Sequence, residues 1–267
     1  MPRDVLLTAF GPHSVEPRTD RVADEAPLEV RVNGESFAVI MRTPGDDDVL
    51  ALGFLLSESV IDGTEDVAET VSWPDDPALA NRINVVLAAD AAAAASVAGR
   101  RRVAMSSACG LCGRVTIESL RHDGVSLPMQ WSVAAAVVRS LPSTLRPTQR
   151  GFDETGGVHA AGLFDRAGAL VTSAEDVGRH NAVDKVVGRM LRDRRLPLED
   201  MLLAVSGRVS FEIVQKALIA GIPLVAAVSA PSSLAIECAQ IGGLTLAAFV
   251  RDERFNVYTH PGRIKQT

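Results

Sequence analysis

Aliphatic runs that alternate with helix-patterned segments in the second half of the chain limit the possible folds more than any other feature. The expected strands are residues 158–164, 169–173, 201–205, 222–228, 244–250 and 255–259. The expected helices are residues 176–192, 210–220 and 232–241. Continuous aliphatic strands are typical of a sheet buried on both faces. The order of elements predicts an α/β fold, a three-layer sandwich around a largely parallel sheet.

The first half predicts a smaller, β-rich region. Residues 28–32 and 36–42 are expected to form a hairpin around Asn33-Gly34, followed by a helix over 45–60 that Thr43 caps. Residues 82–87 are expected to be a further strand. We therefore expect four regions along the chain. They are a flexible N-terminus (1–22), an N-terminal α+β region (23–104), a Cys-motif loop with a helical connector (105–150) and an α/β core (151–267).

Composition excludes several functional classes. The net charge is −6, without the basic excess that a nucleic-acid-binding protein usually has. No run of about 18 apolar residues and no signal-peptide pattern is present, so we expect a cytoplasmic protein that does not enter a membrane. The three cysteines, Cys109, Cys112 and Cys238, are too few for a disulfide framework.

The pair Cys109 and Cys112, in Cys-Gly-Leu-Cys-Gly, is the most specific chemical signal. A structural zinc site needs about four ligands, a thioredoxin motif opens a helix, and a zinc deaminase has His-x-Glu before Pro-Cys-x-x-Cys. The chain lacks that His-x-Glu, and Ala108 stands where the proline would be. A persulfide carrier needs only an exposed, activated thiol, and Arg114 could lower a thiol pKa. The motif alone leaves these interpretations open, and we expect no bound metal.

Three polar segments are candidates for binding an anionic ligand, and the first two lie after expected strands. Helix N-termini and strand carboxyl ends favour such ligands. The first segment offers Arg179, His180 and Lys185, although Lys185 and Asp184 could instead form an ordinary surface pair. The second offers Ser206 and Arg208, and its serine could equally be a helix cap. The third segment comprises Phe249, Val250, Arg251, Asp252, Glu253 and Arg254. Arginines beside an aromatic ring could hold a guanine nucleotide, although a solvated hairpin is the simpler interpretation.

Together these motifs resemble the formate dehydrogenase accessory sulfurtransferase family, FdhD. The matching segments are residues 25–34 (EAPLEVRVNG), 41–47 (MRTPGDD), 109–113 (CGLCG), 155–161 (TGGVHAA), 175–185 (EDVGRHNAVDK) and 256–261 (NVYTHP). Several long motifs in the same order are far more specific than one cysteine pair.

The resemblance implies a fold similar to the cytidine deaminases, without their zinc chemistry. It implies a sulfur carrier that accepts sulfur from a cysteine desulfurase as a persulfide on Cys109, with Cys112 beside it. The carrier then passes sulfur to the molybdenum bis(molybdopterin guanine dinucleotide) cofactor before that cofactor enters formate dehydrogenase. The family's cofactor-binding stretch maps onto residues 249–254. The resemblance also implies a homodimer and no permanently bound cofactor. The alternatives are a cofactor-binding chaperone without sulfur chemistry and a zinc-dependent hydrolase.

Overall fold

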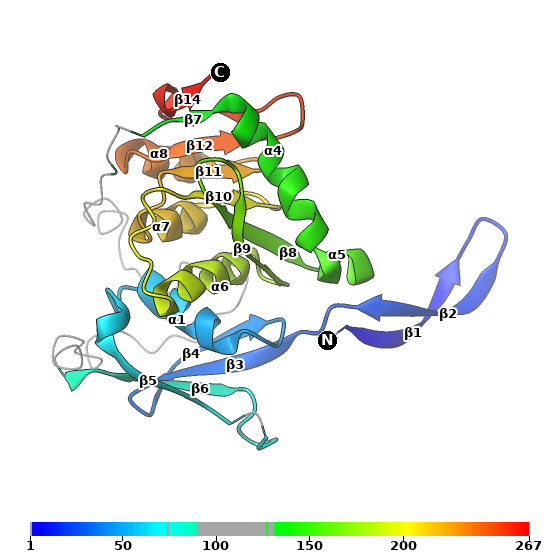
Figure 1. The fold of residues 1–267 in the computed structure, drawn as a ribbon. Helices are drawn as coiled ribbons and strands as arrows, with labels where there is room; N and C mark the ends of the chain where they lie inside the picture. The colour runs from blue at the N-terminus through cyan, green and yellow to red at the C-terminus, as the bar shows by residue number, and fades with distance from the viewer. Residues whose placement is uncertain (1, 74, 90–126, 128–130, 267) are drawn as a thin grey trace.

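The computed structural model describes residues 2–73, 75–89, 127 and 131–266 of the chain (Figure 1). Its central element is a six-stranded sheet with the order β13-β12-β11-β10-β8-β9. The strands are β8 (His159–Phe164), β9 (Leu170–Asp176), β10 (Leu202–Val205), β11 (Leu224–Ala227), β12 (Thr245–Ala248) and β13 (Asn256–Val257). All six expected strands of the second half are therefore present.

The sheet is mixed, so the expectation of a largely parallel sheet is wrong. Only the pairs β10–β11 and β11–β12 are parallel, because in each pair a helix lies between the two strands and returns the chain to the starting edge. Strands β8 and β9 form an antiparallel hairpin through the turn at residues 165–168, and β8 pairs antiparallel with β10. Strand β13 turns back against β12 on the opposite edge.

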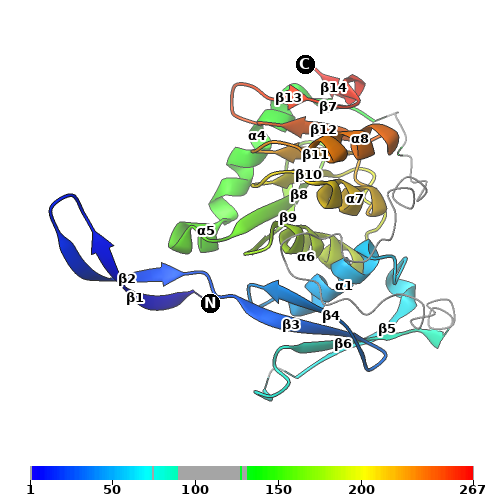
Figure 2. The ribbon, with the colours of Figure 1, turned by 180° about the vertical axis from the view of Figure 1, so that it is seen from behind.

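Helices cover both faces of this sheet, as a three-layer sandwich requires (Figures 1 and 2). Helices α6 (Arg179–Arg192), α7 (Phe211–Ile219) and α8 (Ser233–Ile241) lie on one face, and α4 (Ala135–Leu145) lies on the other. Leu203 and Val205 point into the core under α6 and α7, whereas Leu202 and Ala204 point into the core under α4. The sheet is thus buried on both faces. The expected likeness to cytidine deaminases remains a prediction.

Helix α4 lies within the segment that was expected to be a connector, residues 105–150. In the structure it forms the outer layer over the second face of the sheet, and Val138, Leu141 and Leu145 are buried there. The short elements η2 (Arg146–Thr148) and α5 (Arg150–Thr155) continue from it toward β8. Because α4 buries its apolar stripe against the sheet, this part of the chain belongs to the core.

The N-terminal region is a second sheet with the order β4-β3-β6-β5. Its strands are β3 (Ala26–Val32), β4 (Glu35–Arg42), β5 (Val67–Ser72) and β6 (Arg82–Leu87). The β3–β4 turn falls at Asn33-Gly34 as expected, and both residues have positive φ. The short elements η1 (Thr64–Asp66), β7 (Val133–Ala134), η3 (Pro261–Arg263) and β14 (Ile264–Lys265) complete the described structure.

Helix α1 (Asp47–Ser57) joins this region to the core by packing against α6. Gly53 of α1 and Gly188 of α6 lie at the crossing, where a Cβ on either would meet the other helix's backbone within about 2.0 Å. The expected cap at Thr43 is wrong, because the helix begins after Asp46, which has a left-handed conformation. The Thr43 hydroxyl instead accepts a hydrogen bond from the Val177 backbone at 3.0 Å.

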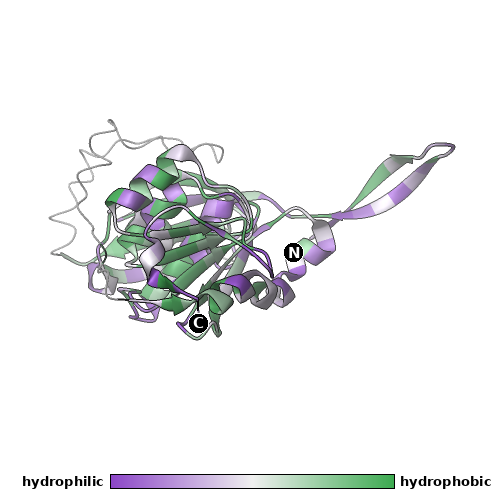
Figure 3. Ribbon diagram, turned by 90° about the horizontal axis from the view of Figure 1, so that it is seen from above, coloured by the Kyte–Doolittle hydropathy of each residue, from purple (hydrophilic) through white to green (hydrophobic). Residues whose placement is uncertain are grey.

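Residues 1–22 were expected to have no regular structure, but residues 3–22 form a long hairpin. Strands β1 (Arg3–Phe10) and β2 (Val15–Val22) pair antiparallel over their full length and project away from the rest of the molecule (Figure 3). Leu6 and Phe10 are 86% and 80% exposed on this arm. The polar composition concealed the strands, because neither face of the hairpin is buried and no alternation of apolar residues was required. In the described part of the chain, no helix has the length and apolar character needed to cross a membrane.

Candidate functional site: a cavity at the carboxyl ends of the parallel strands

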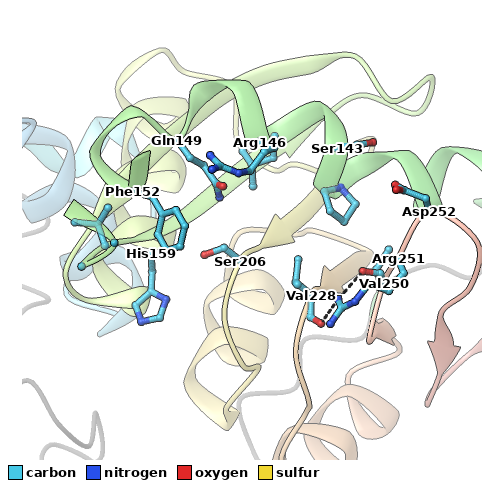
Figure 4. Close-up of a pocket in the computed structure, with 15 residues that line it drawn as sticks. Ser143, Arg146, Gln149, Phe152, His159, Ser206, Val228, Val250, Arg251 and Asp252 are labelled. Atoms are coloured by element: carbon cyan, nitrogen blue, oxygen red, sulfur yellow. Dashed lines mark hydrogen bonds between the residues drawn. The ribbon is translucent and has the colours of Figure 1, made fainter. Parts of the chain in front are cut away.

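A cavity of about 630 Å³ opens at the edge of the central sheet where β10, β11 and β12 end (Figure 4). The chain continues from these strands into Ser206, Val228 and Val250, which line its floor. The other lining residues are Pro142, Ser143, Leu145, Arg146, Gln149, Phe152, Gly156, Gly157, Val158, His159, Arg251 and Asp252. Carboxyl ends of parallel strands are the usual ligand-binding edge of an α/β sheet.

Half of the expected cofactor-binding stretch, residues 249–254, lines the cavity. Val250, Arg251 and Asp252 line the cavity. The Arg251 guanidinium is held in place because its Nη1 donates to the carbonyl oxygens of Val228 at 2.6 Å and Val250 at 2.9 Å (Figure 4). Its other donors are therefore presented in a fixed orientation.

The remaining three residues of this stretch lie outside the cavity wall. Phe249, Glu253 and Arg254 do not line the cavity. The Arg251 backbone N–H donates to the Arg254 carbonyl at 2.9 Å, so the chain turns at residues 251–254. Phe249 has a left-handed conformation and is exposed. Arg251 is thus the cation of this stretch that faces the cavity.

Ser206 lines the cavity, but its hydroxyl already has a structural partner. Its Oγ accepts a hydrogen bond from the Ala160 backbone at 2.9 Å, and its own N–H donates to the Ala160 carbonyl at 2.9 Å. Ser206 therefore extends the pairing of β10 with β8 to the rim of the cavity. The next residue, Gly207, leaves room for His159, because a Cβ on Gly207 would lie 3.2 Å from the Nδ1 atom of His159.

His159 stands at the cavity wall amid cationic groups. It is partly buried at the start of β8, and desolvation lowers its pKa below the ordinary value of 6.5. The charge of Arg179 lowers this pKa further, as do His180 and Arg208. A neutral imidazole beside two guanidinium groups can accept or donate a hydrogen bond without adding charge.

Arg179 and Arg208 make this side of the cavity a candidate anion site. Arg179 is the first residue of α6, where free backbone N–H groups favour anions. Its buried Nε has no hydrogen-bond partner among the described residues, and its Cδ lies beside Gly207. Arg208 is exposed. The two side chains expected to contact phosphate are thus brought to the same part of the structure as His159.

His180, the next residue of α6, faces α7. Its Nε2 lies 2.9 Å from the Ser210 hydroxyl and 3.5 Å from the Glu212 carboxylate. Burial opposes ionisation of Glu212, but hydrogen bonds from His180 and Ser210 outweigh it and lower the pKa of Glu212 to about 2. The carboxylate thus holds one ring nitrogen of His180 and fixes the orientation of the imidazole.

Lys185 does not reach the cavity, so its expected contact with phosphate is corrected. The residue is 2% exposed, and its ammonium lies 2.8 Å from the carboxylate of Asp176, which is fully buried. The same carboxylate accepts hydrogen bonds from Asn181 and from the backbone of Thr43 and Gly178. A buried cation needs such a partner, so Lys185 joins the N-terminal region to the core.

Asp184 is likewise interior and does not pair with Lys185 on the surface. Both of its oxygens accept from the Lys216 ammonium, at 2.7 and 2.8 Å, and one also accepts from the Ser57 hydroxyl at 3.0 Å. Burial raises the pKa of Asp184, and Lys216 opposes this shift. This pair fastens α6 to α7 and α1.

The opposite wall of the cavity was missed by the sequence analysis. Arg146, Gln149 and Phe152 reach it from the α4–α5 segment (Figure 4). The Glu175 carboxylate accepts from the backbone of Gly151 at 2.7 Å and Phe152 at 2.9 Å, which fixes α5 beside the sheet. No local pattern in 142–152 distinguishes these residues from an ordinary amphipathic helix, so only the tertiary structure identifies them.

The predicted thiols Cys109 and Cys112 lie outside the described residues. The described thiol, Cys238, is on α8. Burial raises its pKa to about 11, which disfavours the nucleophilic thiolate. Within the described ranges no group of three or more His, Cys, Asp or Glu side chains is arranged to hold a metal ion.

Comparison with known proteins gives one consistent family. A protein named sulfur carrier protein FdhD from Anaeromyxobacter sp. (strain K) is 48% identical over 258 residues, covering 93% of this chain and 90% of its own length. A protein of the same name from Sulfolobus acidocaldarius is 46% identical over 248 residues, covering 92% and 91%. The crystal structure of a protein assigned as a formate dehydrogenase accessory protein, from Desulfotalea psychrophila, superimposes with a TM-score of 0.79 at 26% identity. It covers 99% of both chains.

The family model described as FdhD/NarQ matches residues 23–265, which include the six-stranded and four-stranded sheets, all six described α-helices and every residue of the cavity wall. This chain belongs to the FdhD/NarQ family.

Proposed function

We propose that this protein is a sulfur carrier that delivers sulfur to the molybdenum bis(molybdopterin guanine dinucleotide) cofactor before the cofactor enters formate dehydrogenase. A cysteine desulfurase supplies the sulfur, and Cys109 carries it as a persulfide with Cys112 as its neighbour. The protein acts in the cytoplasm as a homodimer. The names of the relatives support the role in sulfur transfer, since they are called sulfur carriers and align over 93% of the chain.

The observation that carries the cofactor part of this proposal is the chemistry of the cavity wall. Phe152, Leu145 and Val158 offer apolar surface to a flat ring system. Arg251 and Arg146 line the same space, and Arg179 and Arg208 lie beside His159. Arginine is suited to phosphate because its planar fork donates two hydrogen bonds at once. A cargo with aromatic rings and phosphates therefore matches the residues present.

The sulfur step is thiol–persulfide exchange. The Cys109 thiolate attacks the outer sulfur of the donor's persulfide, a new S–S bond forms, and the donor cysteine leaves as a thiolate. The rate of such exchange depends on thiolate character and on access to the attacking sulfur. Cys238 meets neither condition, since it is partly buried and its pKa is raised to about 11.

Intact-mass spectrometry after incubation with a cysteine desulfurase and cysteine tests this assignment. The wild type should gain one or more sulfur atoms, and Cys109→Ala should lose that gain. Cys238→Ala is the matched control, because it removes one thiol of low reactivity and should gain sulfur as the wild type does. A gain that persists in Cys109→Ala would refute the role of this thiol.

No sulfur gain in a folded wild type, with an active desulfurase, would favour a different function. The cavity would then indicate a chaperone that binds the cofactor without sulfur chemistry. In that case Arg251→Ala should abolish support of formate dehydrogenase, whereas Cys109→Ala should not.

A further inference from the structure

The β1–β2 arm has two free edges, of which one is protected against further strand pairing and the other is not. Among the described residues β1 pairs with β2 alone, so its other edge keeps unpaired N–H and C=O groups. Residues 5–10 of β1 read VLLTAF, without a charge or a proline. On β2, Pro17 removes a backbone donor and lies among the charged residues Glu16, Arg18, Asp20 and Arg21. Proline and charges are the usual means of blocking an edge strand, so only the β1 edge is open to a partner strand.

The arm also has an uncharged face that none of the described residues covers. Beyond the ion pair of Asp4 with Arg21 at the base, its residues are Leu6, Thr8, Phe10, Val15, Pro17 and Thr19. All six are exposed, and the arm projects away from the rest of the molecule (Figure 3). A two-stranded hairpin is at best marginally stable in water, whereas three or more strands with an apolar face are stable. A further strand beside β1 would therefore stabilise the arm.

A second copy of β1 fits this edge, because the strand is complementary to itself. In antiparallel pairing about a two-fold axis, one residue must lie opposite its own copy, since opposed residues point to the same face of the sheet. Leu6 and Leu7 are the central residues of β1, so either can lie at the axis. In both registers the uncharged faces of the two arms lie on the same side of one four-stranded sheet.

The charges of the arm favour the register with Leu6 at the axis. In that register Arg3 lies opposite Ala9 of the partner subunit, and Ala9 pairs with Glu16 within its own hairpin. Arg3 and the partner's Glu16 are then two strand spacings apart, about 10 Å between Cα atoms, which two long side chains can bridge. The symmetry forms this pair of opposite charges twice. With Leu7 at the axis, Arg3 would lie beyond the end of the partner's strand and would lose the contact.

We propose that the free edge of β1 pairs antiparallel with β1 of a second copy of this chain, with Leu6 at the two-fold axis. This inference rests on the homodimer of the proposed function and assigns its interface. Because the two strands run in opposite directions, the tip of each arm reaches the base of the other. The base of the arm adjoins α5, where Arg21 lies 3.1 Å from the carboxylate of Glu154. Each copy thus contributes the tip of its arm to the α5 side of the other copy.

The variants Leu6→Lys and Thr19→Lys separate this pairing from other uses of the arm. Leu6 and Thr19 face each other across the hairpin and share its uncharged face, but Thr19 is on the protected strand. Leu6→Lys sets two ammonium groups opposite each other at the axis. We expect it to raise the dissociation constant of the dimer about tenfold or more in sedimentation equilibrium. Thr19→Lys is the matched control and should dimerise as the wild type does, whereas a partner packed on the face of the arm would be sensitive to both variants.

A mixing experiment completes the test. Leu6→Glu alone should also weaken the dimer, but an equimolar mixture of Leu6→Glu and Leu6→Lys should form it, because opposite charges then meet at the axis. This rescue would also show that both variants fold. The proposal would be overturned by Leu6→Lys dimerising as tightly as the wild type, by equal losses in Leu6→Lys and Thr19→Lys, or by a mixture that remains monomeric.

A monomeric wild type would overturn both this interface and the homodimer, and would leave the β1 edge to a strand of another protein. None of these outcomes decides the role in sulfur transfer. The gain of sulfur on Cys109, measured by intact mass, tests that role separately.

Discussion

Helix α6 has two sides with different roles, although one continuous motif, residues 175–185, supplies both. Its buried side holds Asn181, Asp184 and Lys185, each paired with a group from another element. Its N-terminus carries Arg179 near the cavity, with a buried Nε that has no partner among the described residues. The two sets look alike in the sequence, since both are polar residues in an aliphatic context.

The comparison shows how to tell which polar residues of such a motif stabilise the fold and which are available to bind a ligand. Charges on the buried side neutralise each other across elements, as Lys185 does with Asp176. Near the cavity, Arg179 and Arg208 act on His159 in the same direction, and both lower its pKa. Like charges gathered beside a cavity cost stability and are favoured only when an anion binds there. Whether a charged side chain has a partner within the protein therefore distinguishes a structural residue from a candidate ligand-binding residue.

Removing the central carboxylate of the buried side should have the largest effect. In Asp176→Ala the ammonium of Lys185 loses its counter-charge, and three hydrogen-bond donors lose their acceptor. An uncompensated buried charge of this kind costs about 3–5 kcal/mol, which urea unfolding would measure. The control Asp200→Ala removes an exposed ion pair with Arg166 and should cost about 1 kcal/mol or less. Similar losses in the two variants would remove the distinction between buried and exposed pairs.

A methyl group at the α1–α6 crossing should have the next largest effect. In Gly188→Ala the new Cβ would lie 1.9 Å from the Val49 carbonyl oxygen, so the helices must separate. Overpacking of this type costs about 1–3 kcal/mol, and the free energy of unfolding from urea titration would show it. Gly262→Ala, where a Cβ meets no atom within 4 Å, is the control and should be nearly neutral. An unchanged stability in Gly188→Ala would show that the crossing has space that the structure does not indicate.

The sequence predicted most elements because their patterns are local. Aliphatic runs marked the strands of the central sheet, and Asn33-Gly34 marked the turn of the N-terminal hairpin. It did not predict the direction of β8 and β9, since antiparallel pairing depends on where the chain returns. It also missed the β1–β2 arm, which buries neither face and so lacks the alternation that identifies a strand.

The sequence predicted residues on the sheet side of the cavity but none on the α4–α5 wall. Ser206 was expected there because parallel strands share a carboxyl edge, and Arg251 because arginines beside an aromatic residue could hold a nucleotide. Gln149 and Phe152 come from the α4–α5 segment, and no local sequence pattern connects that segment to the cavity. Lys185 was misplaced because the sequence gives a residue's charge but not its partner, and the partner is Asp176, nine residues away.

Removing a cation near the cavity should affect binding and leave stability nearly unchanged. Arg208 is exposed, so Arg208→Ala should change the free energy of unfolding by about 0.5 kcal/mol or less. It should weaken GDP about tenfold in calorimetric titration, as the loss of one charge-assisted hydrogen bond implies. Arg192→Ala, at the far end of α6 and paired with Asp48, is the matched control and should bind GDP normally. Equal affinity in Arg208→Ala would place the phosphates elsewhere.

The effect with the narrowest pH range should come from Glu212 of α7, which contacts His180 near the N-terminus of α6. Its pKa is lowered from 4.5 to about 2 in the folded protein, so its charged form stabilises the fold. That contribution is fully present above the unfolded value of 4.5 and is lost as the pH falls toward 2. Glu212 stays charged between pH 6 and 8 in both the folded and the unfolded state. The difference in unfolding free energy between wild type and Glu212→Gln should therefore be constant in that range and should shrink below about pH 4.5. A difference that stays flat down to pH 3 would mean that His180 does not hold this carboxylate in its charged form, and the imidazole would then be free to face the cavity.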